Sequence, residues 1–185
     1  MTKGLARDLL EVFVLALGLY LLATTTIQTV HVVGLSMSPT LGDNDVLIAS
    51  KVDYRLHDPE RGDIIILKSP LDPSRDYIKR VIGLPFDHLL IRDHRVLING
   101  IVLEEPYVRN WIGNGDFPPN NPNAVDGDVI PSGMYFVMGD NRDHSSDSRL
   151  FGYVSRDQID GKAVLRVWPW SHLALLDVRP TLACS

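Results

Sequence analysis

The chain has 185 residues, of which 45% are hydrophobic, and its formal net charge is −5 at pH 7. This length suits one domain with an additional segment, and the apolar content is sufficient for a sizeable core. The negative charge and the lack of any Lys/Arg cluster argue against a nucleic-acid partner. The single cysteine, Cys184, permits neither an internal disulfide nor a cysteine zinc cluster. We expect no metal and no cofactor.

The first predicted element is a helix that crosses a membrane. Residues 12–30 carry no charged side chain, and these 19 residues just span a hydrocarbon core as a helix. Lys3 and Arg7 precede the run, and the next basic residue is Lys51. This bias favours a cytoplasmic N-terminus and an outward-facing remainder.

Two alternatives to an anchor are weaker. A cleaved signal peptide usually has a shorter apolar core and a small-residue cleavage site, but ATTTIQTVHVV follows here. A buried core helix is the other alternative, and the length of the run favours a membrane span over it. We therefore expect residues 1–30 to form a cytoplasmic stub and a single plasma-membrane anchor. Residues 31–185 are then the extracytoplasmic domain.

Beyond the anchor, short apolar runs between turn residues predict strands. The runs are DVLIAS, DIIILK, YIKRVIG, HLLIR, RVLI, IVLEE, MYFVMG and KAVLRVW. Asn99-Gly100 is a strong hairpin signal, and Asp93-His94 is a second predicted turn. Residues 110–128 are rich in Gly, Pro and Asn, which predicts a long surface loop with little structure. The fold class is mainly β, with a largely antiparallel sheet behind one transmembrane helix.

One candidate nucleophile lies in the segment GLSMSPTL, between two predicted strands. Its Gly, Ser and Pro residues suit an exposed turn, and Ser36 there could act as a nucleophile. Serines in such turns are more often simple turn residues. Taken alone, the segment favours the structural interpretation.

A candidate general base lies inside the predicted strand YIKRVIG. Alternation places Tyr77, Lys79 and Val81 on one face of the strand. Apolar burial disfavours an ammonium and lowers its pKa, which is how a lysine becomes a base. A lysine whose stem lies along the sheet while its head reaches water is the commoner arrangement.

The third polar segment, GDNRDHSSDSRLFG, does not match the spacing of a calcium loop. Asp147 and Arg149 are two residues apart, so on an extended chain they point the same way and can pair. The VWPW segment contains Trp168 and Trp170. A membrane-interface position and core packing are both open for these indoles.

Together, these segments resemble the sequence boxes of type I signal peptidases. SMSPTL at residues 36–41 matches the nucleophile box, and RGDII at 61–65 matches a second box. YIKRVIGLPFD at 77–87 matches the lysine box, with Phe86 where glycine is common. GDNRDHSSDSR at 139–149 matches the fourth. The resemblance covers residues 10–167, and four boxes in order are highly specific.

The resemblance implies a role for each matching residue. Ser36 would be the nucleophile and Lys79 its general base, in the place that histidine takes in a Ser-His-Asp triad. Ser38 is at the variable position of its box. The supporting residues would be a serine that hydrogen-bonds the lysine, a salt bridge and a further structural acid: Ser145, Asp147 with Arg149, and Asp140.

The resemblance also implies the substrate and its pockets. Exported preproteins would be cut after small residues at positions −3 and −1, at the surface of a lipid bilayer. The residues implied to line these pockets are Val30, Val32, Met37, Leu41, Leu47, Ile66, Tyr77 and Ile78. For Leu47 and Ile66, a position in the core is an equal alternative.

One departure from the family pattern concerns the oxyanion hole. Some family members have a serine two residues before the nucleophile, where this chain has Gly34. The Ser36 backbone N–H would then need a second donor, for which the Gly34 backbone or a water is a candidate.

Two other functions compete with the peptidase. A self-cleaving Ser–Lys repressor would have a DNA-binding segment and no anchor. A non-enzymatic anchored β-domain would lack Ser36 or Lys79. The sequence opposes both.

Overall fold

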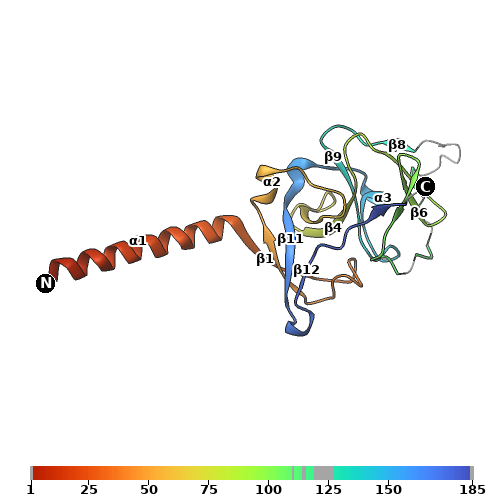
Figure 1. Cartoon of the computed structure of the whole chain (residues 1–185). Helices are drawn as coiled ribbons and strands as arrows, with labels where there is room; N and C mark the ends of the chain where they lie inside the picture. The colour runs from red at the N-terminus through yellow and green to blue at the C-terminus, as the bar shows by residue number, and fades with distance from the viewer. Residues whose placement is uncertain (1, 110, 114–115, 119–126, 184–185) are drawn as a thin grey trace.

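The computed structural model describes residues 2–109, 111–113, 116–118 and 127–183. It has one long helix, α1 (Thr2–Thr26), followed by a β-rich domain. Figure 1 shows α1 projecting away from the domain. The segment Arg7–Thr26 has a mean hydropathy of 1.9 and none of it is buried, as a membrane-spanning helix requires.

The helix ends four residues before the predicted boundary at residue 30. β1 (Ile27–His31) follows α1 directly and pairs with β2 (Val46–Ser50). Thr24 and Thr25 donate their hydroxyls back to carbonyls of the preceding turn, and the chain then becomes extended. β-branched residues such as Thr and Ile favour strand geometry, which accounts for the early end. The uncharged run of residues 12–30 therefore contains the end of α1 and most of β1.

The domain contains two sheets, and the predicted antiparallel strand pairing is confirmed. One has eight strands in the order β1-β2-β11-β3-β4-β9-β10, with β12 added to β11. The other has five strands in the order β13-β7-β6-β5-β8. The remaining strand bounds are β3 (Ile64–Lys68), β4 (Asp76–Gly83), β5 (His88–Arg92), β6 (Arg95–Ile98), β7 (Ile101–Glu104), β8 (Asp128–Val129), β9 (Met134–Met138), β10 (Val154–Ser155), β11 (Ile159–Trp168), β12 (Ala174–Leu175) and β13 (Thr181–Leu182).

Short helices complete the domain: α2 (Asp53–Leu56), α3 (Ser148–Phe151), η1 (Arg156–Gln158) and η2 (Trp170–His172). Both predicted turns are present, because β5 and β6 meet at Asp93-His94, and β6 and β7 meet at Asn99-Gly100. All four turn residues have positive φ, the geometry of a type I′ turn. Trp168 and Trp170 are 49% and 72% exposed, so they do not pack in the core.

The segment predicted as an unstructured loop contributes to the core. Parts of residues 110–128 lie outside the described residues, as does Cys184. Phe117 is only 8% exposed, bridges to Ile91, and packs against the Phe136 ring at 4.7 Å. The prediction missed this because one aromatic residue among Gly, Pro and Asn gives no periodic signal.

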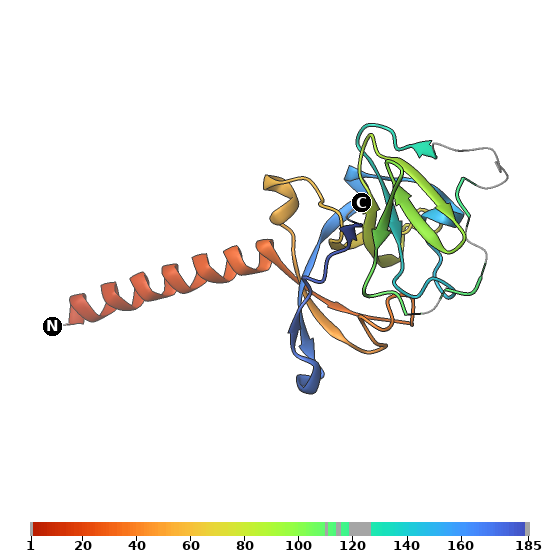
Figure 2. The same ribbon diagram turned by 45° about the vertical axis from the view of Figure 1, so that its right-hand side comes forward.

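The two sheets are joined by polar and apolar contacts. Arg142, which is fully buried, donates from both terminal nitrogens to Glu105, just after β7. The C-terminal segment crosses from β12 to β7, where Thr181 and Leu182 add β13. Figure 2 shows the second sheet on the side of the domain away from α1. This arrangement leaves β1 and the start of β4 on the side near α1.

We predict that Phe117→Ala lowers the free energy of unfolding by about 3–5 kcal/mol, the usual cost of deleting a buried phenylalanine. Phe86→Ala removes the same side chain from a site that is 68% exposed, and should change stability by less than about 0.5 kcal/mol. Denaturant unfolding of the full chain in detergent measures both. Equal, small effects would contradict an anchoring role for Phe117.

Candidate active site

Ser36 lies in a tight turn that leads from β1 toward β2. Ser38 N–H donates to the Leu35 carbonyl at 3.1 Å, and Leu41 N–H donates to the Met37 carbonyl at 2.9 Å. Met37 and Leu41 are buried in the core and fix the turn from below. Ser36 itself is half-buried, so its hydroxyl is held at the surface of a cleft.

Lys79 reaches this hydroxyl from β4. Its Nζ donates to Ser36 Oγ at 2.9 Å, although 43 positions separate the two residues in the chain. Lys79 is 3% exposed, and its Nζ lies 5.1 Å from the centre of the Tyr77 ring. The predicted strand face therefore places the ammonium in a poorly hydrated site.

Burial decides the protonation of this lysine. Desolvation lowers the pKa of Lys79 to about 8, against the opposing pull of the Asp147 and Asp140 carboxylates. Arg149 lowers it further by charge repulsion. At neutral pH a lysine with this pKa has about one side chain in ten as free base, whereas an ordinary lysine has almost none. The geometry and the protonation state both suit a general base.

The segment 139–149, which matches the fourth sequence box, holds the Ser36 turn in place through Asn141. Its backbone N–H donates to the Ser36 carbonyl at 3.0 Å, and its Nδ2 donates to the Leu35 carbonyl at 3.1 Å. Sequence reasoning matched Asn141 within the box but gave it no role. Its position in the ten-residue polar run from Asp140 to Arg149 was the available signal.

Asp147 and Arg149 form the expected salt bridge. Arg149 donates from Nε and Nη2 to the two Asp147 oxygens at 2.8 and 2.9 Å. Asp147 also accepts from the Gly139 backbone N–H at 3.1 Å and is fully buried. The pair therefore ties the end of the box to its beginning.

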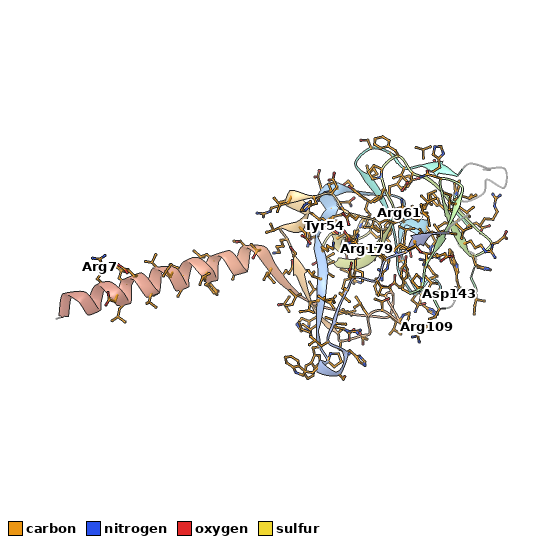
Figure 3. All side chains as sticks on the ribbon, viewed as in Figure 1. Arg7, Tyr54, Arg61, Arg109, Asp143 and Arg179 are labelled. Atoms are coloured by element: carbon orange, nitrogen blue, oxygen red, sulfur yellow. The ribbon has the colours of Figure 1, made fainter. Side chains whose placement is uncertain are left out.

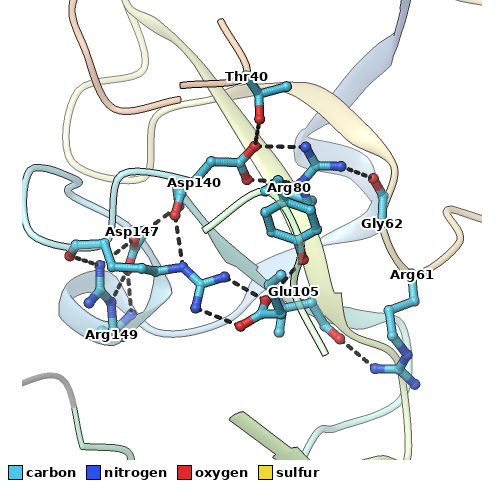
Figure 4. A network of polar contacts seen from close by, with 12 residues as sticks. Thr40, Arg61, Gly62, Arg80, Glu105, Asp140, Asp147 and Arg149 are labelled. Carbon is cyan, nitrogen blue, oxygen red and sulfur yellow. Dashed lines mark hydrogen bonds and ion pairs between the residues drawn. The ribbon is translucent and has the colours of Figure 1, made fainter. Parts of the chain in front are cut away.

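Asp140 pairs with the residue that follows the lysine. Arg80 donates to both Asp140 oxygens at 2.8 and 2.7 Å, and both side chains are fully buried. Thr40 Oγ1 donates to the same carboxylate, which links the nucleophile turn to β4 (Figure 4). Arg80 also donates to the Gly62 and Val178 carbonyls and lies 3.8 Å over the Tyr107 ring. Sequence reasoning missed the roles of Arg80 and Thr40, since no spacing rule links distant positions.

Ser145 differs from the expectation. Its Oγ is buried and has no hydrogen-bond partner among the described residues, so the expected bond to Lys79 is absent here. A Cβ at Gly139 would lie 2.3 Å from Ser145 Oγ and 2.4 Å from the Ser36 carbonyl oxygen. Only glycine at position 139 allows Ser145 and the Ser36 turn to approach this closely.

The cleft beside Ser36 has a volume of about 400 Å³. Five of the eight predicted pocket residues line it: Val30, Val32, Met37, Tyr77 and Ile78. The other three, Leu41, Leu47 and Ile66, are instead fully buried in the core beneath. All three belong to the core cluster against which Val30 and Ile78 pack, so they support the cleft without lining it. Gln28 and His31 also line the cleft, and sequence reasoning did not name them.

Two unpaired strand edges border the cleft. β1 pairs with β2, and no second partner of β1 occurs in the described part of the chain. β4 pairs with β9 only from Arg80 onward, which leaves the edge of Asp76–Lys79 unpaired on that side. Unpaired backbone donors and acceptors next to the Ser36 hydroxyl can bind an extended peptide.

The candidate second oxyanion donor is engaged elsewhere. Gly34 N–H donates to Asp43 Oδ1 at 2.8 Å, so the suggestion that this amide holds the oxyanion does not fit the structure. Ser36 N–H has no hydrogen-bond partner within the described ranges and is free to donate. No group of His, Cys, Asp or Glu side chains suited to a metal ion is found in the described residues.

Comparisons with known proteins identify the family of this chain. A family model described as signal peptidase, peptidase S26, matches residues 6–168. A signal peptidase I from Leptolyngbya laminosa is 39% identical over 91% of this chain and 80% of its own length. Signal peptidase IB from Staphylococcus aureus is 32% identical over 93% of this chain and 94% of its own.

A solved structure of a signal peptidase I from Enterococcus faecalis is also similar. It is 38% identical, covers 57% of this chain and 97% of its own, and has a TM-score of 0.49. The family model spans most of this chain, and the relatives match nearly its whole length. The chain therefore belongs to the signal peptidase family, peptidase S26, a family of serine peptidases.

Proposed function

We propose that this protein is a membrane-anchored endopeptidase that removes signal peptides from exported preproteins with a Ser36–Lys79 dyad. The observation that carries the proposal is the 2.9 Å contact between Lys79 Nζ and Ser36 Oγ in a buried site. Family membership supports the reaction class, and the contact supports the assignment of the two residues.

Acylation begins when Lys79 is a free base. It accepts the Ser36 proton while Oγ attacks the scissile carbonyl, and the Ser36 N–H donates to the developing oxyanion. Collapse of the tetrahedral intermediate breaks the C–N bond, and the Lys79 ammonium returns the proton to the leaving amine. The neutral lysine then activates a water, which hydrolyses the acyl-enzyme and regenerates Ser36.

The surrounding residues keep the dyad in place. Asn141 and the Asp147–Arg149 pair hold the turn and the box against each other. We assign the unpartnered Ser145 hydroxyl to accept a hydrogen bond from the neutral Lys79 amine when Ser36 is acylated and no longer accepts that bond. Asp140 acts through Arg80 and Thr40 as a positioning residue.

The substrate would bind as an added strand. An extended peptide between β1 and the start of β4 satisfies its backbone from both edges, and alternate side chains point into the cleft. Val30, Val32, Met37 and Ile78 make the cleft shallow and apolar beside Ser36. Small side chains at −3 and −1 fit it, whereas large or charged ones do not.

The anchor places the cleft at the membrane. α1 continues into β1 without a linker, and β1 lines the cleft. A preprotein whose signal peptide lies in the bilayer would present its cleavage site at this height. With Lys3 and Arg7 on the cytoplasmic side, the domain faces outward.

We predict that Ser36→Ala and Lys79→Arg each lower kcat/KM for an Ala-x-Ala preprotein by at least about 10³-fold. Arginine keeps the charge but cannot release its proton at working pH. Ser38→Ala is the matched control, since it removes a serine hydroxyl two positions away in the same turn, and it should retain activity. A well-folded Lys79→Arg protein with near-normal turnover would contradict the dyad.

The pH dependence of kcat/KM should rise through a limb near pH 8, because the free base of Lys79 is the active form. Asp147 raises this pKa, so Asp147→Asn should move the limb to lower pH, while activity falls. Initial rates measured from pH 5 to 10 on both proteins test the sign. A limb that moves to higher pH in Asp147→Asn opposes the assignment.

Phenylalanine or aspartate at position −1 of the preprotein should abolish cleavage, since a ring would clash with the apolar residues proposed to form the pocket beside Ser36, and a carboxylate would be desolvated against them. The same residues at −2 serve as the control, because that side chain points away on an extended chain. Gel analysis of processing measures each substrate. Cleavage of both −1 variants at the wild-type rate would show that the pocket assignment is wrong.

A further inference from the structure

A second cavity, of about 490 Å³, lies beside the substrate cleft and shares Gln28 with it. Its lining is strongly basic, with side chains that converge from four places in the chain: Lys51, Arg55, Lys68 and Arg156. Asp160 is the one acidic residue among the described residues that line it. The peptidase mechanism uses none of these charges.

The cavity lies at the point where α1 meets the domain. Lys51 N–H donates to the carbonyl of Thr26, the last residue of α1, at 2.9 Å. Arg55 is on α2, and Figures 1 and 2 both show α2 beside the C-terminal end of α1. Figure 3 places Tyr54 of α2 there as well. When α1 spans a bilayer, this cavity is at the level of the lipid headgroups.

Two of the four cations are already compensated. Lys68 contacts Asp76 at 2.6 Å and Asp160 at 3.5 Å. Arg156 donates to the Tyr54 carbonyl and lies 3.7 Å from Asp58.

The other two cations are uncompensated. The side chains of Lys51 and Arg55 have no hydrogen bond or ion pair with any residue that the structure describes. The cavity therefore presents two positive charges that an external anion can neutralise.

Exposed apolar residues adjoin, in the chain, the segments at which these cations lie. Leu56 follows Arg55 on α2 and is 72% exposed, and Ile27 follows Thr26 and is 48% exposed. A free phosphate would gain nothing from such neighbours. A phospholipid combines an anionic phosphate with acyl chains, so it matches both the charge and the apolar surface.

We propose that this cavity binds the phosphate of an anionic membrane lipid, with Lys51 and Arg55 as its donors and Leu56 and Ile27 against the acyl region. The proposal rests on the membrane anchoring proposed above. A basic residue near an anionic bilayer surface favours binding about five-fold. Together, the two residues should favour an anionic over a neutral lipid by about 25-fold.

The test uses the full chain in neutral detergent micelles and fluorescent phosphatidylglycerol or phosphatidylcholine with identical acyl chains. The ratio of the two affinities is compared between wild type and the double variant Lys51→Gln/Arg55→Gln. The matched control is Arg95→Gln/Arg109→Gln, which changes net charge equally at two exposed sites after the lysine box. Figure 3 shows Arg109 far from α1.

We expect the preference for phosphatidylglycerol to fall about 25-fold in Lys51→Gln/Arg55→Gln and less than about two-fold in the control. Equal affinities of wild type for both lipids, or equal losses in both double variants, would overturn the proposal. Displacement of the lipid by millimolar inorganic phosphate would assign the site to free phosphate instead. Cleavage of a preprotein is measured in the same micelles, so a failure of the peptidase proposal is detected separately.

Discussion

The removal of the Lys79 ammonium from water is the constraint on which the site depends. A lysine at the surface would stay protonated at neutral pH and could not accept the Ser36 proton. Here the side chain is 3% exposed, and desolvation outweighs two nearby carboxylates to bring its pKa to about 8. A buried ammonium without a full counter-charge is costly. The surrounding β-sheet must therefore be rigid enough to keep Nζ at 2.9 Å from the Ser36 hydroxyl.

Arg80, the next residue, is also a buried cation, but its charge is compensated by a carboxylate. Arg80 follows Lys79 on β4 and points to the other face, where Asp140 accepts two hydrogen bonds from it. A buried pair of this kind fixes the positions of its two side chains, and removing one partner lowers the free energy of unfolding by about 3–5 kcal/mol. Through Thr40, the same carboxylate holds the nucleophile turn. One strand thus carries a compensated cation that fixes the structure and an uncompensated one that can titrate.

Local patterns were enough to predict the antiparallel strands, the I′ turn at Asn99-Gly100, a turn at Asp93-His94 and the apolar face around Lys79, because each depends on neighbours in sequence. The resemblance supplied the Ser36–Lys79 and Asp147–Arg149 pairings, which the geometry brings together. Contacts between distant segments could not be predicted in this way. Phe117 in the core, Asn141 on the Ser36 turn and the burial of Leu47 below the cleft arise only when the strands assemble. The sequence likewise could not show that the Gly34 N–H, a candidate oxyanion donor, already donates to Asp43.

The continuity of α1 and β1 relates the chemistry to the membrane, because the anchor, the substrate cleft and the basic cavity all meet at Thr26 and Gln28. The central claim, however, is that burial prepares Lys79 as a base, and this can be measured without any substrate. The most direct measurement is an NMR titration of the Lys79 side-chain nitrogen in the full-length Ser36→Ala protein, which cannot turn over. A midpoint near pH 8 is predicted. A midpoint at the ordinary lysine value of about 10.4 would contradict the account.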